Sequence, residues 1–149
     1  MKILSEPLEI LLVEDNKGDI GLITEFFLDS KIRTNIHIAE DGEEAIQFLY
    51  AEDKFLGSHN PDLIILDWNL PKKSGLEVLR EIKANNNLKN IPVIILTTSS
   101  AETDIFRAYD LHANAYLVKP IDLDEFMKTI KSIGDFWFKA VTLPPKHSH

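Results

Sequence analysis

The sequence predicts an α/β fold with a doubly wound parallel sheet of about five strands, on two observations. Short apolar runs rich in β-branched residues recur along the chain, and stretches with helical spacing of apolar residues separate them. Strands that are buried on both faces read as continuous apolar runs, and crossover helices cover both faces of such a sheet. The candidate strands are Glu9–Val13, Asn35–Ala39, Asp62–Leu66, Val93–Leu96 and Ala115–Val118.

Helices are predicted between the strands and after the last one. Asp41, Ser74 and Asp122 each stand before a helical pattern and can accept backbone N–H bonds as N-caps. The least regular helical pattern is that of the fourth crossover, 101–112, a segment that we expect either to be mobile or to serve as a contact face. Residues 51–61 include Gly, Ser, Asn and Pro and are predicted to form a surface loop. The other apolar stripes run through Ile20, Ile23, Phe27, Ala45, Ile46, Leu49, Leu76, Leu79, Ile82, Leu123, Phe126, Met127, Ile130 and Ile133.

The composition indicates one soluble domain. A chain of 149 residues with 44% hydrophobic content can build a single core, which we expect at 8–133, followed by a C-terminal extension at 134–149. The net charge of -8 disfavours binding to nucleic-acid backbones, and the absence of cysteine excludes disulfides and thiolate metal sites. Because the apolar runs are far shorter than the roughly 20 residues that cross a bilayer, we expect a cytoplasmic protein without a membrane partner.

Acidic residues stand just past two of the predicted strands. Glu14 and Asp15 follow the first strand, and Asp67 follows the third. The carboxyl ends of parallel strands face one crevice, and a switch in strand order lets the loops after these two strands meet there. Three converging carboxylates repel one another unless a cation neutralises them, and hard oxygen ligands without thiols favour Mg²⁺. The sequence therefore predicts a magnesium site.

The next two strand ends supply groups that complement a phosphoryl group. Thr97 follows the fourth strand, and Lys119 and Pro120 follow the fifth. The Lys119 ammonium can neutralise a phosphoryl oxygen, and the Thr97 hydroxyl can donate a hydrogen bond to another. Each residue alone has an ordinary structural explanation, such as a helix cap for Asp15 or a loop for Lys119 and Pro120. Four strand ends that carry acid, acid, hydroxyl and amine together favour phosphate chemistry on a carboxylate.

These residues resemble the response-regulator receiver family over 8–133. The motifs that carry the resemblance are Leu12–Asp15, Leu66–Pro71, Leu96–Thr97 and Val118–Pro120. The resemblance implies a flavodoxin-like fold and a switch that is phosphorylated on Asp67. It implies Mg²⁺, or Mn²⁺ as a substitute, bound by Glu14, Asp15, Asp67 and the backbone carbonyl of Asn69. It also implies that Lys119 and Thr97 contact the phosphoryl group.

Further roles follow from the same resemblance. Tyr116 matches the aromatic residue that changes rotamer together with the switch threonine, Thr97. Asn69 and Ser99 match positions that tune the lifetime of the phosphorylated state, and the Lys119–Pro120 peptide bond is expected to be cis. The chain departs from the common family pattern at two positions. Glu14 stands where Asp is commoner, and Thr98 stands where a small residue usually follows the switch threonine. The bulkier Thr98 is expected to narrow access to the acceptor.

The chain also resembles the small response regulators that partner bacterial phytochromes. The features that carry this likeness are a longer loop before the third strand, a tail after Ile133, and the segments Leu96–Ser100 and Phe136–Phe138. This likeness implies that a light-sensing histidine kinase donates the phosphoryl group. It also implies a homodimer formed through the side of the fourth helix and the aromatic tail. Three successive aromatic residues cannot all face one core, so we expect either two buried and one exposed, or an adhesive edge. The last residues, 146–149, read as a disordered tail.

The sequence disfavours two other functions. An Asp-nucleophile phosphatase of the haloacid dehalogenase type would place a second Asp two positions after the nucleophile, where this chain has Asn69. A pseudo-receiver, which binds partners without phosphotransfer, would lack at least one of the reactive side chains. We therefore expect a phosphoacceptor switch and not an enzyme.

Overall fold

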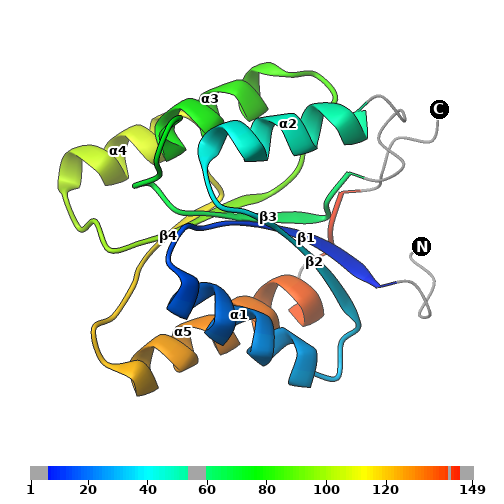
Figure 1. The fold of residues 1–149 in the computed structure, drawn as a ribbon, viewed down its shortest axis with the longest axis vertical. Helices are drawn as coiled ribbons and strands as arrows, with labels where there is room; N and C mark the ends of the chain where they lie inside the picture. The colour runs from blue at the N-terminus through cyan, green and yellow to red at the C-terminus, as the bar shows by residue number, and fades with distance from the viewer. Residues whose placement is uncertain (1–6, 54–59, 141, 145–149) are drawn as a thin grey trace.

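The computed structural model describes residues 7–53, 60–140 and 142–144. Strands and helices alternate along the chain, and the strands form a parallel sheet in the order β2-β1-β3-β4-β5 (Figure 1). The predicted fold class is confirmed. In chain order the elements are β1 Leu8–Val13, α1 Lys17–Asp29, β2 Thr34–Ala39, α2 Gly42–Asp53, β3 Leu63–Leu66, α3 Gly75–Ala84, β4 Val93–Thr97, α4 Glu102–Asp110, β5 Ala115–Val118, α5 Leu123–Gly134 and the π-helical turn η1 Asp135–Ala140.

Two apolar layers enclose the sheet. Helices α2, α3 and α4 cover one face, and α1 and α5 cover the other (Figure 1). Successive residues of a strand point to opposite faces, so Leu11 and Val13 of β1 join the first layer while Ile10 and Leu12 join the second. The continuous apolar runs in the sequence reflect this burial on both faces.

The predicted helix starts are confirmed. Ser74 forms a capping box with Glu77 at the start of α3, and the Asp122 side chain accepts a hydrogen bond from the backbone of Asp124 at the start of α5. The Asp41 carboxylate accepts the backbone N–H of Glu44 at 2.7 Å. Segment 101–112 contains a regular helix, α4.

The expectation for the loop at 51–61 needs correction, and the expectation for the aromatic tail falls partly outside the described residues. The predicted surface loop at 51–61 is wrong at both ends, because α2 continues through Asp53 and because Asn60 and Pro61 are buried. Residues 54–59 lie outside the described part. In the aromatic tail, Trp137 packs against the α1 and α5 layer while Phe136 is 56% exposed. The side chain of Phe138 and residues 145–149 are outside the described part as well.

None of the helices in the described residues has the length and apolar character needed to cross a membrane.

Candidate functional site

The carboxyl ends of β1 and β3 bring the predicted acidic residues together. The two strands are neighbours in register, with Val13 opposite Leu66. The backbone N–H of Asp67 donates to the Val13 carbonyl at 3.0 Å, which fixes Asp67 beside the end of β1. Between β1 and β3 the chain order of the sheet reverses, and such switch points are where open α/β sheets bind their ligands.

Three carboxylates converge at this switch point. Glu14, Asp15 and Asp67 each offer an oxygen atom, and these atoms all lie within 4.8 Å of one another. Glu14 is only 1% exposed and Asp67 only 7% exposed, whereas Asp15 is exposed to solvent. Carboxylate oxygens at this spacing, with one open side, suit a hard divalent cation that keeps some of its water ligands. The residues present therefore fit the predicted metal.

Lys119 enters the same cluster from the end of β5. Its Nζ lies 2.6 Å from Oε1 of Glu14, 2.8 Å from Oδ2 of Asp19 and 3.4 Å from Oδ2 of Asp67. Its backbone N–H donates to the Thr97 carbonyl at 2.6 Å, so β4 and β5 hold it in place. The ammonium is thus the positive centre of a group of buried or partly buried carboxylates.

The prediction of a cis peptide bond between Lys119 and Pro120 is wrong. None of the peptide bonds among the described residues is cis. The trans form before proline is favoured by about 0.5–1 kcal/mol unless surrounding contacts select cis. Here the Lys119 side chain reaches its carboxylate partners with the bond in the trans form.

Asp19 is a site residue that the sequence analysis missed. It lies in the first turn of α1, where its backbone N–H donates to the Asn16 side chain at 2.9 Å. An acidic residue in a first helical turn is favoured by the helix dipole alone, so its position gave no separate signal. The only clue was that α1 follows directly after Glu14 and Asp15, which places its first turn above the same crevice.

Burial and charge shift the ionisation of this cluster. Burial raises the pKa of Glu14 to about 7, and the nearby charge of Asp67 adds to the increase although the hydrogen bond from Lys119 opposes it. Burial acts to lower the pKa of Lys119, but its hydrogen bonds to Asp19 and Glu14 outweigh that effect and raise the pKa above the ordinary value. The Lys119 ammonium therefore stays charged, whereas Glu14 changes its ionisation near neutral pH.

The loop after β3 is packed tightly around the acceptor. The backbone N–H of Asn69 donates to Oδ1 of Asp67 at 3.2 Å. At the start of α3 the backbone N–H of Gly75 donates to the Trp68 carbonyl at 3.0 Å. A Cβ atom on Gly75 would collide with the carbonyl oxygen of Asp67 and would lie 2.6 Å from the Cα of Trp68. Glycine is therefore required there for α3 to begin against this loop.

Residues 10–131 match the family described as the response regulator receiver domain. The chain belongs to this family. Response regulator Rcp1 of Synechocystis is 47% identical to the receiver over 138 residues, which cover 93% of this chain and 94% of Rcp1. The crystal structure of the Mn²⁺-bound form of Rcp1 matches with a TM-score of 0.87 and 47% identity over 93% of this chain and 100% of that one. The crystal structure of the phosphorylated cyanobacterial phytochrome response regulator RcpA matches with a TM-score of 0.88 and 46% identity over 94% of this chain and 100% of that one.

Behind the acceptor of this receiver, a hydrogen-bonded group connects β4, α4 and β5. Thr97 is fully buried, and its Oγ1 accepts the backbone N–H of Ser99 at 3.4 Å. The Tyr116 hydroxyl donates to the Ser99 carbonyl at 2.9 Å, and the Tyr116 ring meets Trp68 edge to face at 6.5 Å. Burial raises the pKa of Tyr116, so its hydroxyl remains a donor. Ser99 Oγ donates to Asp104 at 2.6 Å. Thr98 is exposed beside this group.

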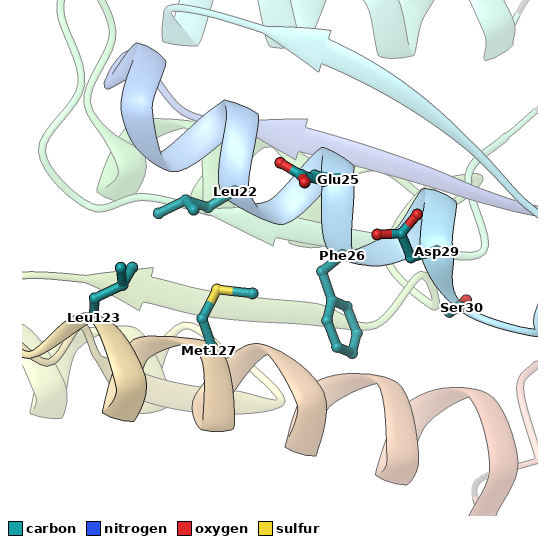
Figure 2. Close-up of a pocket in the computed structure, with 7 residues that line it drawn as sticks. All are labelled: Leu22, Glu25, Phe26, Asp29, Ser30, Leu123 and Met127. Atoms are coloured by element: carbon teal, nitrogen blue, oxygen red, sulfur yellow. The ribbon is translucent and has the colours of Figure 1, made fainter.

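A separate groove of about 310 Å³ lies between α1 and α5 of the receiver, and Glu14, Asp15 and Asp67 are not among the residues that line it. Leu22 and Phe26 of α1 face Leu123 and Met127 of α5 across it (Figure 2). Glu25 and Asp29 lie on its α1 side, so an apolar floor has an acidic border (Figure 2).

Proposed function

We propose that the protein is a phosphorylation switch in which Asp67 accepts a phosphoryl group from the phosphohistidine of a sensor histidine kinase. The observation that carries the proposal is the meeting of Asp67 with Glu14, Asp15 and Lys119 in one crevice. Acidic oxygens for a cation, a carboxylate nucleophile and an ammonium within reach are what a phosphoryl transfer to carboxylate requires.

Glu14, Asp15, Asp67 and the backbone carbonyl of Asn69 would hold Mg²⁺, and Mn²⁺ could replace it. The proposal is supported by the spacing of the three carboxylates and by the Mn²⁺-bound state of the similar protein Rcp1. A bound divalent cation supplies positive charge that lowers the repulsion between the acceptor and the incoming phosphoryl group. Because Glu14 is buried with a raised pKa, its proton must leave before it can act as a ligand.

In the transfer step, an oxygen of Asp67 forms a bond to phosphorus while the bond between phosphorus and the kinase histidine nitrogen breaks. The electron pair of that bond returns to the imidazole, which takes a proton from its surroundings. Lys119 donates a charged hydrogen bond to one phosphoryl oxygen, and the Thr97 hydroxyl donates to another. The residues act by position and charge, since a carboxylate is a weak nucleophile. The receiver is the acceptor of the group and is not an enzyme acting on a separate substrate.

Phosphorylation would be read out through Thr97 and Tyr116. When Thr97 turns toward the phosphoryl group, the hydrogen bond between its Oγ1 and Ser99 is lost. Tyr116, whose hydroxyl already holds the Ser99 carbonyl, then adjusts with the loop, and the surface of α4 and β5 changes. Asn69 beside the acceptor and Ser99 beside the switch are the positions proposed to tune the lifetime of the state.

The kinase we propose is a bacterial phytochrome, acting with this receiver in the cytoplasm. The proposal is supported by the similarity to RcpA, a cyanobacterial phytochrome response regulator. Phosphotransfer from a panel of purified kinases in red and far-red light tests it, and preferred transfer from a kinase that senses no light would refute it.

A homodimer through α4 and the aromatic tail is part of the same proposal. It is supported by Phe106, which is 71% exposed on α4, and by the exposed Phe136 on η1. Sedimentation equilibrium of the wild type and of Phe106→Ser tests it. A monomeric wild type at high concentration, with and without phosphorylation, would contradict it.

Mass measurement tests the central proposal. Incubation with acetyl phosphate and Mg²⁺ should add one phosphoryl group to the wild type and to Asp29→Asn, an exposed control, but none to Asp67→Asn. A wild type that gains no mass would make the chain a binding module without phosphotransfer. Continuous release of phosphate from a stable phosphate monoester would instead indicate a phosphatase.

A further inference from the structure

The Lys119 ammonium already uses all of its hydrogen-bonding capacity in the structure. An ammonium has three donors, and Glu14, Asp19 and Asp67 each supply an acceptor oxygen to it. Its side chain is 6% exposed, so water cannot easily replace a lost partner. A phosphoryl oxygen that needs a donor from Lys119 must therefore take it from one of these carboxylates.

The three partners do not hold Lys119 equally. The distances to Glu14 and Asp19 are 2.6 and 2.8 Å, whereas the distance to Asp67 is 3.4 Å. The ammonium is thus drawn toward the end of β1 and the first turn of α1, and away from the acceptor. Glu14 is also a proposed cation ligand, so a bound cation competes with Lys119 for it. Asp19 is then the carboxylate that still holds the ammonium on the α1 side.

We propose that Asp19 is a positioning residue that holds Lys119 on the α1 side of the crevice. It thereby weakens the binding of a phosphoryl group at Asp67. This inference rests on the proposed function, because it concerns the same acceptor. Asp19 is well placed for such a role: it is anchored through its own backbone N–H to Asn16, independently of any cation. Its side chain is 23% exposed, which leaves a pair with Lys119 that is strong enough to compete and weak enough to be exchanged.

Beryllofluoride, a phosphoryl analogue, provides the test when it is titrated at saturating Mg²⁺ and binding is followed by tryptophan fluorescence. Trp68 follows the acceptor directly and is the expected reporter. Asp19→Asn should lower the half-saturating concentration about three- to tenfold, the effect of freeing one charged hydrogen bond. Asp19→Glu, which keeps the charge, should return it close to the wild-type value. Glu25→Gln removes the same charge from an exposed position of the same helix and should change nothing.

A double-mutant cycle shows whether Asp19 acts through Lys119. Lys119→Met should itself weaken binding, and adding Asp19→Asn to it should bring no gain. An equal gain in that background, or a gain in Glu25→Gln as large as in Asp19→Asn, would mean a general charge effect and would overturn the inference. Unchanged or weaker binding in Asp19→Asn would overturn it as well.

Two controls keep the outcomes separate. A wild type that gives no saturable response refutes the proposed function, whereas a wild-type response that Asp19→Asn leaves unchanged refutes only the role of Asp19. Circular dichroism and urea unfolding check that each variant is folded. Asp19→Ser, which also removes the carboxylate and suits a first helical turn, is the second variant and should behave as Asp19→Asn does.

Discussion

Glu14→Gln should remove the loss of stability that Glu14 causes in the cation-free protein as the pH rises from 5 to 8. The Glu14 carboxyl is buried, and its pKa is raised from 4.5 to about 7 chiefly by that burial. Between these two pH values the folded protein keeps the proton while the unfolded chain releases it. The contribution of Glu14 to stability is therefore greatest below pH 4.5, and it is lost as the pH rises toward 7.

The size of the effect follows from the two pKa values. The difference between 4.5 in the unfolded chain and about 7 in the folded protein corresponds to about 3 kcal/mol in the free energy of unfolding. Lys119 does not change how the free energy of unfolding depends on pH in this range, since its contribution to stability is fully present below its ordinary pKa of 10.5. The glutamine variant resembles the protonated wild type, so it should be only slightly more stable than the wild type at pH 5, and the difference should grow to most of this amount at pH 8.

Urea unfolding followed by tryptophan fluorescence from pH 5 to pH 8 in the presence of a chelator measures the difference. Contributions that the two proteins share cancel when the two curves are subtracted. Mg²⁺ should restore stability to the wild type at pH 8 and should do so much less in Glu14→Gln, because the variant lacks one carboxylate ligand. Glu25→Gln should follow the wild type throughout. If the free energies of unfolding of the wild type and Glu14→Gln follow parallel curves against pH, Glu14 is not a buried carboxyl with a raised pKa.

Three further substitutions test the frame around the site. Gly75→Ala should destabilise the fold by about 1–3 kcal/mol and weaken Mg²⁺ binding, because its Cβ would meet the Asp67 carbonyl; a normal urea midpoint with normal Mg²⁺ titration would contradict this. Ser74→Ala should cost about 0.5–2 kcal/mol through loss of the α3 cap, with Ser74→Asp as the control that keeps it. Tyr116→Phe should lose about 0.5–1.5 kcal/mol, the hydrogen bond to Ser99. A larger loss in urea unfolding would show that the Tyr116 ring has moved as well.

The arrangement of strands could be predicted because burial on both faces leaves a direct trace in the sequence. The run Ile64–Leu66 has no polar residue since its side chains enter the two layers in turn. The start of α3 was predictable for a similar local reason, the capping pair of Ser74 with Glu77. The region 51–61 was not, because Ala51 and the acidic residues after it suit a helix end as well as a loop. Only tertiary packing decides that Asn60 and Pro61 are buried.

Most of the site was predictable from its place in the topology. Glu14, Asp15, Asp67 and Lys119 lie at strand ends, and a parallel sheet brings such ends to one edge, where the structure places them together. The trans peptide bond before Pro120 was not predictable by this reasoning, because the two isomers differ by so little energy that local contacts decide. The roles proposed for Thr97 and Tyr116 concern a second conformation and remain predictions.

The charge balance of the crevice explains why Asp19 matters and why strand-end reasoning could not find it. Reasoning from strand ends counts the groups that would bind a cation or a phosphoryl group, and Asp19 is not one of them. Its effect comes from competition for Lys119, the ammonium that faces all of these carboxylates. One ammonium cannot neutralise so many acidic groups, and the charge of Asp67 adds to the increase that burial causes in the pKa of Glu14. A site with more carboxylates than cationic groups favours the binding of a divalent cation. A phosphoryl group at Asp67 must still compete with Asp19 for the hydrogen bonds of Lys119.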